Sequence, residues 1–213
     1  MKVLVVNGSP RRSMNTAQLL EKVAEGAATG GSEVELVHLR DHQFSGCISC
    51  FHCKDPQGKS YGRCILKDDL RGVLELAHEA DVLVLGTPFY FGTETALMRA
   101  FLERLWFQYF LYTLKKPPLS PRKKATALIY TMNVKEEDMA AYGKTAIVEA
   151  AKKYMEMLFA PCEVFLCTDT KQVKDYSRYE MDMWDVEAKD KRHKEVFPED
   201  LNKAFELGRK LVA

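Results

Sequence analysis

Short apolar runs alternate along the chain with segments in which apolar residues recur every three or four positions. The apolar runs are rich in β-branched residues and predict five buried strands, at residues 2–7, 33–39, 82–86, 125–130 and 163–167. The helical spacing predicts helices that start near residues 15, 68, 95, 142 and 198. Strands that alternate with helices are typical of a doubly wound parallel sheet, so we predict an α/β fold with helices on both faces.

The chain has no internal repeat and no low-complexity tract, and we predict a single domain over residues 1–213. Two connections are longer than the usual loop. Residues 40–67 hold four of the six cysteines, and residues 109–124 are rich in aromatic residues and proline. Long loops inside a domain often carry function or contacts. The charged segment 171–196 is expected to be a solvated loop or a short helix.

Charge and cysteine content narrow the class of protein. Thirty-one Lys and Arg residues face 30 Asp and Glu residues, a net charge of +1, which argues against nucleic-acid or anionic-membrane binding as the main activity. No apolar run is long enough to span a bilayer, and the first residues do not read as a secretory signal, so we expect a cytoplasmic protein. In that compartment the cysteines are expected to be free, metal-binding or redox-active.

The segment after the first strand contains many groups that bind anions. In an open parallel sheet, ligands bind beyond the carboxyl ends of the strands. The start of the first helix lies there, and its free N–H groups and dipole favour negative charge. The side chains that accompany it are Ser9, Arg11, Arg12, Ser13, Asn15 and Thr16. Neither a P-loop nor a dinucleotide fingerprint is present, so a single terminal phosphate is the expected ligand. Taken alone, the segment could equally serve only to start the helix.

Two other strand ends add candidate contacts. The third strand is followed by Pro88, Phe89, Tyr90, Phe91 and Gly92, which could form an aromatic or backbone wall for a flat ring. The alternative is that these aromatic residues cap the core. The fourth strand is followed by Thr131, Met132 and Asn133, whose backbone N–H groups or Asn133 amide could approach the edge of such a ring.

Several segments together resemble a known family. They are NGSPR at 7–11, NT at 15–16, GCISCFHC at 46–53, KDDL at 67–70, TPFYFG at 87–92 and FLER at 101–104. This combination resembles the NAD(P)H-dependent FMN reductase and iron–sulfur flavoprotein group of the flavodoxin-like superfamily. The resemblance implies a five-stranded flavodoxin-like sheet with FMN at its carboxyl edge. It also implies that Ser9, Arg11, Asn15 and Thr16 hold the FMN phosphate and that residues 88–92 run along the flavin.

The resemblance implies an FMN-dependent oxidoreductase that accepts hydride from NAD(P)H and passes electrons to a quinone, a flavin or a similar acceptor. The cofactor supplies this chemistry, which agrees with the absence of a convincing nucleophile–histidine–carboxylate set, and no catalytic side chain is assigned. One alternative is an iron–sulfur flavoprotein that exchanges electrons with ferredoxin-like partners. Another is a flavin-binding redox sensor without enzymatic activity, or a structural zinc protein.

The cysteine segment carries the sharpest motif. Cys47, Cys50 and Cys53 form Cys-x-x-Cys-x-x-Cys, and Cys64 follows after ten intervening residues. Three thiolates at this spacing can wrap an iron–sulfur cluster that a remote fourth cysteine completes. In the family resembled, such a motif would map onto these four residues, although its last gap is usually shorter. Zinc is a further option. The preferred interpretation is reduced thiols that pack a loop beside the flavin, with FMN binding independent of any cluster.

Three smaller expectations concern contacts. Asp68 is expected to cap the second helix. Glu103 and Arg104 are expected to pair on a helix face or at a subunit contact. The aromatic run 106–112 suggests an exposed patch, and with it a homodimer or a higher homo-oligomer.

Overall fold

Parallel strands form the central sheet in the order β2-β1-β3-β5-β6, in a computed structural model that describes residues 1–213. Their bounds are β1 Lys2–Asn7, β2 Glu33–His38, β3 Val82–Tyr90, β5 Ala125–Thr131 and β6 Cys162–Cys167. The strand order reverses between β1 and β3, where a chain of this class leaves room for a ligand at the carboxyl edge. The predicted α/β fold with a doubly wound parallel sheet is confirmed.

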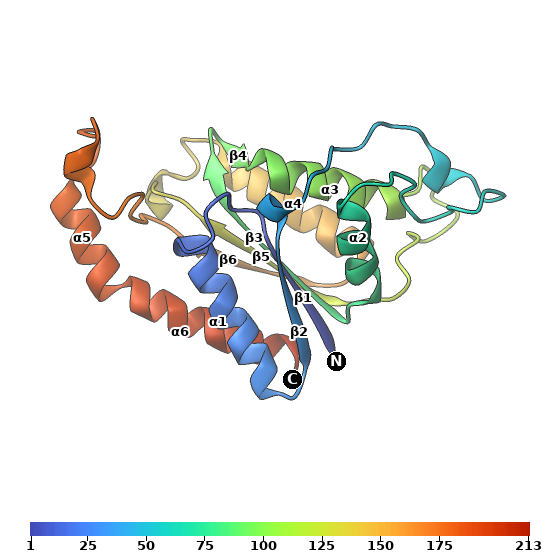
Figure 1. The fold of residues 1–213 in the computed structure, drawn as a ribbon, viewed down its shortest axis with the longest axis horizontal. Helices are drawn as coiled ribbons and strands as arrows, with labels where there is room; N and C mark the ends of the chain where they lie inside the picture. Colours follow the sequence, from blue (N-terminus) through green and yellow to red (C-terminus); the bar gives the residue numbers. More distant parts are fainter.

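Alternate residues of each strand face two separate hydrophobic cores. The helices are α1 Asn15–Thr29, α2 Leu70–Glu79, α3 Ala96–Tyr109, α4 Lys144–Leu158, α5 Val186–Glu195 and α6 Phe197–Leu211. Val3 and Val5 of β1 face the core shared with α1 and α6, whereas Leu4 and Val6 face the core shared with α2, α3 and α4. Figure 1 shows α1 and α6 side by side on one face of the sheet. Helices therefore cover both faces, as predicted.

Glycines allow α1 and α6 to approach each other closely. A Cβ atom on Gly26 would lie 2.0 Å from the carbonyl oxygen of Phe205, and one on Gly208 would lie 2.1 Å from that of Val23. Any larger residue at either position would force the two helix backbones apart.

The third strand is longer than predicted. β3 continues through Tyr90 and pairs in antiparallel fashion with the short strand β4, Thr93–Glu94. The expected loop at 87–93 is therefore a tight hairpin, and the sheet has six strands where five were predicted. Phe91 and Gly92 form the turn with φ values of 49° and 89°. Glycine adopts such angles freely and supplies the second of them.

The segment 171–196 contains α5. The Asp185 side chain caps the start of this helix by accepting a hydrogen bond from the Ala188 N–H at 2.9 Å. Short 3₁₀ turns occupy Leu39–Asp41, His52–Lys54, Glu136–Asp138 and Tyr176–Arg178. None of the helices is both long enough and apolar enough to cross a membrane.

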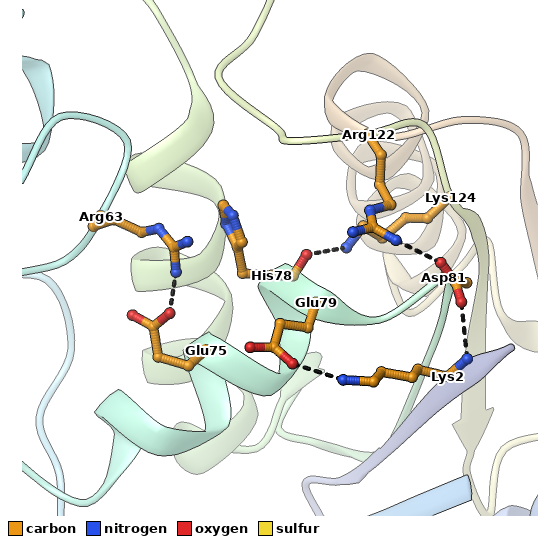
Figure 2. A network of polar contacts seen from close by, with 8 residues as sticks. All are labelled: Lys2, Arg63, Glu75, His78, Glu79, Asp81, Arg122 and Lys124. Carbon is orange, nitrogen blue, oxygen red and sulfur yellow. Dashed lines mark hydrogen bonds and ion pairs between the residues drawn. The ribbon is translucent and has the colours of Figure 1, made fainter. Parts of the chain in front are cut away.

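A polar network fixes the amino edge of the sheet, opposite the edge expected to bind a ligand (Figure 2). The Lys2 N–H donates to Asp81 at 2.8 Å, and the Lys2 ammonium pairs with Glu79 at 2.9 Å. Arg122 pairs with the same Asp81 carboxylate at 2.7 Å. The buried Lys124 ammonium donates to the Ala77 carbonyl at 2.6 Å, near the end of α2. These contacts hold β1, α2, β3 and β5 together where no ligand is expected.

Candidate functional site

A cleft of about 480 Å³, including space open to solvent, lies at the carboxyl edge of the sheet. Its walls come from the carboxyl ends of β3 and β5 and from the segments that follow β1, β5 and β6. The lining residues are Ser9, Arg11, Met14, Asn15, Thr16, Pro88, Phe89, Tyr90, Thr131, Met132, Asn133, Thr170, Lys171 and Gln172. The ends of four separate strands therefore meet at one concave surface, as expected for a parallel sheet.

The first turn of α1 faces this cleft without a cap. Met14 occupies the N-cap position and its side chain makes no capping hydrogen bond. The backbone N–H groups of Asn15, Thr16 and Ala17 have no acceptor within the chain, although these three residues are buried. Unsatisfied donors at a helix start carry a partial positive charge. This geometry suits an anion at the mouth of the helix.

Side chains fix the shape of the loop that leads into α1. The Asn7 amide oxygen accepts the Ser9 N–H at 2.8 Å, and the Ser9 hydroxyl accepts the Arg11 N–H at 3.1 Å. The Thr95 hydroxyl, just before α3, donates to the Gly8 carbonyl at 2.7 Å. At the floor of the cleft, the hydroxyls of Thr16 and Thr131 lie 2.7 Å apart. The donors are therefore positioned before any ligand arrives.

Most of the binding residues predicted from the sequence line the cleft. They are Ser9, Arg11, Asn15, Thr16, Pro88, Phe89, Tyr90, Thr131 and Asn133. Three do not: the Ser13 side chain is exposed to solvent away from the cleft, and Phe91 and Gly92 form the hairpin turn beyond it. Phe91 is fully exposed. Phe91 and Gly92 lie outside the cleft because the extension of β3 into a hairpin carries them past the rim.

Sequence reasoning missed the segment after β6. Thr170, Lys171 and Gln172 form the fourth wall, and the Asn15 amide donates to the Lys171 carbonyl at 2.8 Å. The Arg11 guanidinium donates to the Gln172 carbonyl. The Lys171 ammonium pairs with Asp190 on α5. The same rule that singled out the earlier strand ends applies to β6, and it could have identified this segment.

The aromatic wall is supported from behind by a buried carboxylate. The Phe89 ring lies 5.0 Å from the Tyr130 ring, and the Tyr130 hydroxyl donates to Glu94 at 3.1 Å. Glu94 belongs to β4, is 2% exposed, and also accepts a hydrogen bond from the Thr93 hydroxyl at 2.8 Å. Burial and the Glu94 carboxylate raise the pKa of Tyr130. Glu94 gave no signal in the sequence, because its role depends on the hairpin.

The cysteine segment forms a second, separate cavity against the later part of α3. It is lined by Cys47, Ile48, Cys50, Cys53, Cys64, Ile65, Leu66, Arg104, Phe107 and Gln108. All six cysteines of the chain are free thiols, and four of them line this cavity. The volume of this cavity is about 320 Å³, including space open to solvent. No three His, Cys, Asp or Glu side chains are close enough together to hold a metal ion.

Two expected contacts are wrong. Arg104 is not on an exposed helix face: its side chain is fully buried and pairs with Asp68 at 2.6 Å, while Glu103 accepts the Cys47 N–H at 3.2 Å. Asp68 therefore does not cap α2, whose N-cap position is held by Asp69 without a side-chain bond. The cause is that residues 45–68 fold against α3, which brings Asp68 to Arg104 and the Cys47 N–H to Glu103.

The aromatic run is also mostly internal. Tyr109 is fully buried and Trp106 is 8% exposed, because both pack into the core between α3 and α4. Tyr112 and Leu114 remain exposed. The prediction of a homo-oligomer therefore loses most of the patch on which it rested, and it stays a prediction.

Known proteins resemble the chain in sequence. A family described as NADPH-dependent FMN reductase matches residues 1–166. An iron-sulfur flavoprotein of Archaeoglobus fulgidus is 41% identical over 104 residues, which make up 49% of this chain and 48% of that protein. The chain thus spans about half the length of curated relatives that it matches.

Solved structures share the fold. A NAD(P)H:quinone oxidoreductase from Methanothermobacter marburgensis superimposes with a TM-score of 0.70 at 17% identity, over 99% of this chain and 98% of that one. A flavodoxin from the domain Archaea superimposes with a TM-score of 0.51 at 15% identity, over 100% and 96% of the two chains. The flavodoxin-like fold predicted from the sequence is therefore confirmed.

Proposed function

The chain belongs to the NADPH-dependent FMN reductase family, and from that premise we propose that it is an FMN-dependent oxidoreductase that accepts hydride from NAD(P)H. Family membership makes it a flavoprotein oxidoreductase. The finer proposal adds the position of the cofactor, the route of the electrons and the class of acceptor, which is a quinone, a flavin or a similar small molecule.

The uncapped start of α1 is the observation that carries the proposal. FMN ends in a phosphate, and the cleft offers a set of donors with no acceptor in the chain: the N–H groups of Asn15, Thr16 and Ala17. The hydroxyls of Ser9 and Thr16 and the guanidinium of Arg11 line the same cleft. Anions bind readily at such helix starts. The residues present fit the phosphate end of FMN.

The flavin ring would lie along Pro88, Phe89 and Tyr90, with Asn133 and the backbone after β5 at its edge. When bound, FMN supplies the hydride and electron chemistry, while the protein supplies position and electrostatics. Tyr90 is 37% exposed, so the rim of the cleft stays open to small molecules. A nicotinamide and an acceptor would therefore use the same opening in turn.

Anaerobic mixing of the FMN-loaded protein with excess NADH or NADPH tests this proposal. Hydride transfer should bleach the oxidised flavin absorbance, and steady-state kinetics with a quinone should be ping-pong. If neither nicotinamide reduces the flavin while a ferredoxin-like donor does, the reductase proposal is wrong. The same experiment shows which nicotinamide is preferred.

A second candidate function is electron transfer by an iron–sulfur flavoprotein. The observation that favours it is that Cys47, Cys50 and Cys53 share one cavity with Cys64, which lies eleven residues further along the chain. The relatives named iron-sulfur flavoprotein also support this second candidate. The cysteine side chains are not close enough together to hold a metal ion in this arrangement, so the partly exposed Cys47 and Cys50 would have to move to bind a cluster.

An absorption spectrum of anaerobically isolated protein, with iron, sulfide and zinc analysis, separates the candidates. Flavin bands alone favour the reductase with reduced thiols. Flavin bands with a broad shoulder, iron and sulfide favour the electron-transfer protein. Zinc without iron favours a structural metal, and protein that binds no FMN contradicts both flavin proposals.

A further inference from the structure

Lys144, the first residue of α4, is a buried cation without an anionic partner. Three lysines of the chain are buried: Lys124, Lys144 and Lys189. The Lys124 ammonium donates to the Ala77 carbonyl at 2.6 Å. The Lys189 ammonium donates to the Asn133 carbonyl, also at 2.6 Å. Lys144 is 8% exposed, and its ammonium has two aromatic rings beside it but no oxygen acceptor in the chain. Burial of an ammonium without an acceptor is unfavourable.

The start of a helix is an unfavourable place for such a cation. The N-terminal end of an α-helix carries a partial positive charge. Gly143, with a φ of 67°, holds the N-cap position of α4 without a side-chain hydrogen bond, and the first turn has no acidic residue. The N–H groups of Thr145 and Ala146 have no acceptor in the chain. The ammonium and these free donors therefore add positive potential that no residue of this turn neutralises.

The Lys144 ammonium lies beside the aromatic wall of the cleft. Its nitrogen is 5.6 Å from the centre of the Phe89 ring and 5.2 Å from the centre of the Tyr142 ring. Phe89 lines the cleft, whereas Tyr142 is 61% exposed at the surface. The nitrogen is not one of the unpartnered polar atoms sealed inside the protein. A ligand that extends from the cleft past Phe89 can therefore bring an anion to this cation.

The two cations that line the cleft are already engaged. The Lys171 ammonium pairs with Asp190. The Arg11 guanidinium donates to the Gln172 carbonyl and belongs to the part of the cleft proposed for the FMN phosphate. A nicotinamide nucleotide that reduces the flavin must enter the same cleft, and a single ribose separates its nicotinamide from its pyrophosphate. The lining residues leave this second anion without a cation, and Lys144 supplies one.

We infer that Lys144 and the start of α4 form a subsite for the pyrophosphate of NAD(P)H. This inference rests on the reductase function proposed above. An ammonium beside free N–H groups at a helix start is a set of donors suited to phosphate oxygens. The subsite holds a part of the substrate that does not react, so Lys144 contributes to the capture of NAD(P)H and not to hydride transfer.

Steady-state kinetics of the FMN-loaded protein with a neutral quinone test the subsite. Lys144→Met keeps the apolar stem and removes the charge, so the KM for NADH or NADPH should rise by roughly 10- to 100-fold, as expected for the loss of one hydrogen bond to a charged group. The kcat and the KM for the quinone should change little. Lys144→Arg, which keeps the charge, should stay close to wild type. Lys153→Met removes an exposed charge from the same helix and is the matched control.

Binding of ADP-ribose tests the subsite without turnover, because this compound carries the pyrophosphate but no nicotinamide. Calorimetric titration of the FMN-loaded protein should show a loss of affinity in Lys144→Met similar to the rise in KM, and no loss in Lys153→Met. Added salt should weaken binding to the wild type more than binding to Lys144→Met. FMN affinity and the unfolding temperature show whether the variant is intact, and Lys144→Gln takes its place if it does not fold.

The outcomes that contradict the inference differ from those that contradict the reductase proposal. An unchanged KM for NAD(P)H and an unchanged affinity for ADP-ribose in Lys144→Met would show that the cation only packs against Phe89 and Tyr142. Wild-type protein that does not bind ADP-ribose would contradict the subsite. A higher KM for a sulfonated quinone alone would assign Lys144 to an anionic acceptor and overturn the inference. If ADP-ribose binds through Lys144 but neither nicotinamide reduces the flavin, the pyrophosphate subsite stands and the reductase proposal is wrong.

Discussion

Asn15 and Thr16 contribute both side chains and backbone N–H groups to the first turn of α1. We expect Thr16→Ala and Asn15→Ala to weaken FMN binding by roughly 10- to 100-fold, since a hydrogen bond to a charged group contributes about 1.5–3 kcal/mol. Riboflavin, which lacks the phosphate, should lose much less affinity. Fluorescence titration of the apoprotein with both ligands measures the difference.

Ser13→Ala is the matched control for this pair, because the Ser13 side chain is exposed in the same loop but lies outside the cleft. It should leave both affinities unchanged. Equal losses for FMN and riboflavin in the Asn15 and Thr16 variants would show that the phosphate binds elsewhere.

Lys124, at the edge of the sheet opposite the cleft, is expected to make the stability of the protein depend on pH (Figure 2). Burial lowers the pKa of its ammonium to about 8, although the group donates to the carbonyls of Ala77 and His78. In the unfolded chain its pKa returns to about 10.4. Between these values the unfolded chain binds more protons, so this group makes stability rise with pH across that window. Below about pH 8 its burial cost is fully present.

Urea denaturation of wild type and Lys124→Met at several pH values from 8 to 10 checks this. The unfolding free energy of the wild type relative to that of Lys124→Met should increase as the pH rises. The exposed Lys116→Met serves as the control and should show no such trend. A constant difference across the range would mean that Lys124 keeps an ordinary pKa in the folded state.

At the scale of elements, the contact between α1 and α6 depends on the absence of side chains. We expect Gly208→Ala to destabilise the protein by about 1–3 kcal/mol, because its new methyl group would meet the Val23 carbonyl oxygen at 2.1 Å and push the helices apart. Gly72→Ala in α2 is the matched control, since a Cβ there meets nothing within 4 Å. It should be neutral or stabilising by up to about 1 kcal/mol. Chemical denaturation of both variants gives the comparison, and equal stabilities would contradict the close packing.

The same scale shows why the strands were predictable and the rim of the cleft was not. Residues such as Val3 to Val6 are buried on both faces of a parallel sheet, so their composition alone identifies a strand. The end of β3 depends instead on pairing with β4, and nothing local in the chain marks Thr93 and Glu94 as a strand. The first loop was identifiable because helix starts and anion donors follow local rules. The wall at 170–172 and the burial of Arg104 depend on which distant segments meet.

At the scale of the molecule, the cleft and the cysteine cavity share no lining residue. We therefore expect the double variant Cys50→Ser, Cys53→Ser to bind FMN with an affinity within about twofold of wild type, the spread expected when distant sites act independently. Fluorescence titration of the folded variant, with its fold checked by circular dichroism, measures this. Cys162→Ser, at a buried position outside both sites, controls for general destabilisation. Loss of FMN binding from a folded double variant would show that the two sites are one.

Helix α3 runs from the loop beside the cleft to the cysteine cavity. Thr95, at its start, holds the loop beside the cleft, and Arg104 lies nine residues later against the cysteines. At the rise of an α-helix this is about 14 Å along the axis. A helix packed into the core on one side keeps its length, so α3 holds Thr95 and Arg104 at a fixed separation. If both places carry electron carriers, the length of α3 helps to set the distance between them. Inserting or deleting one turn of α3 would then change the rate of electron transfer.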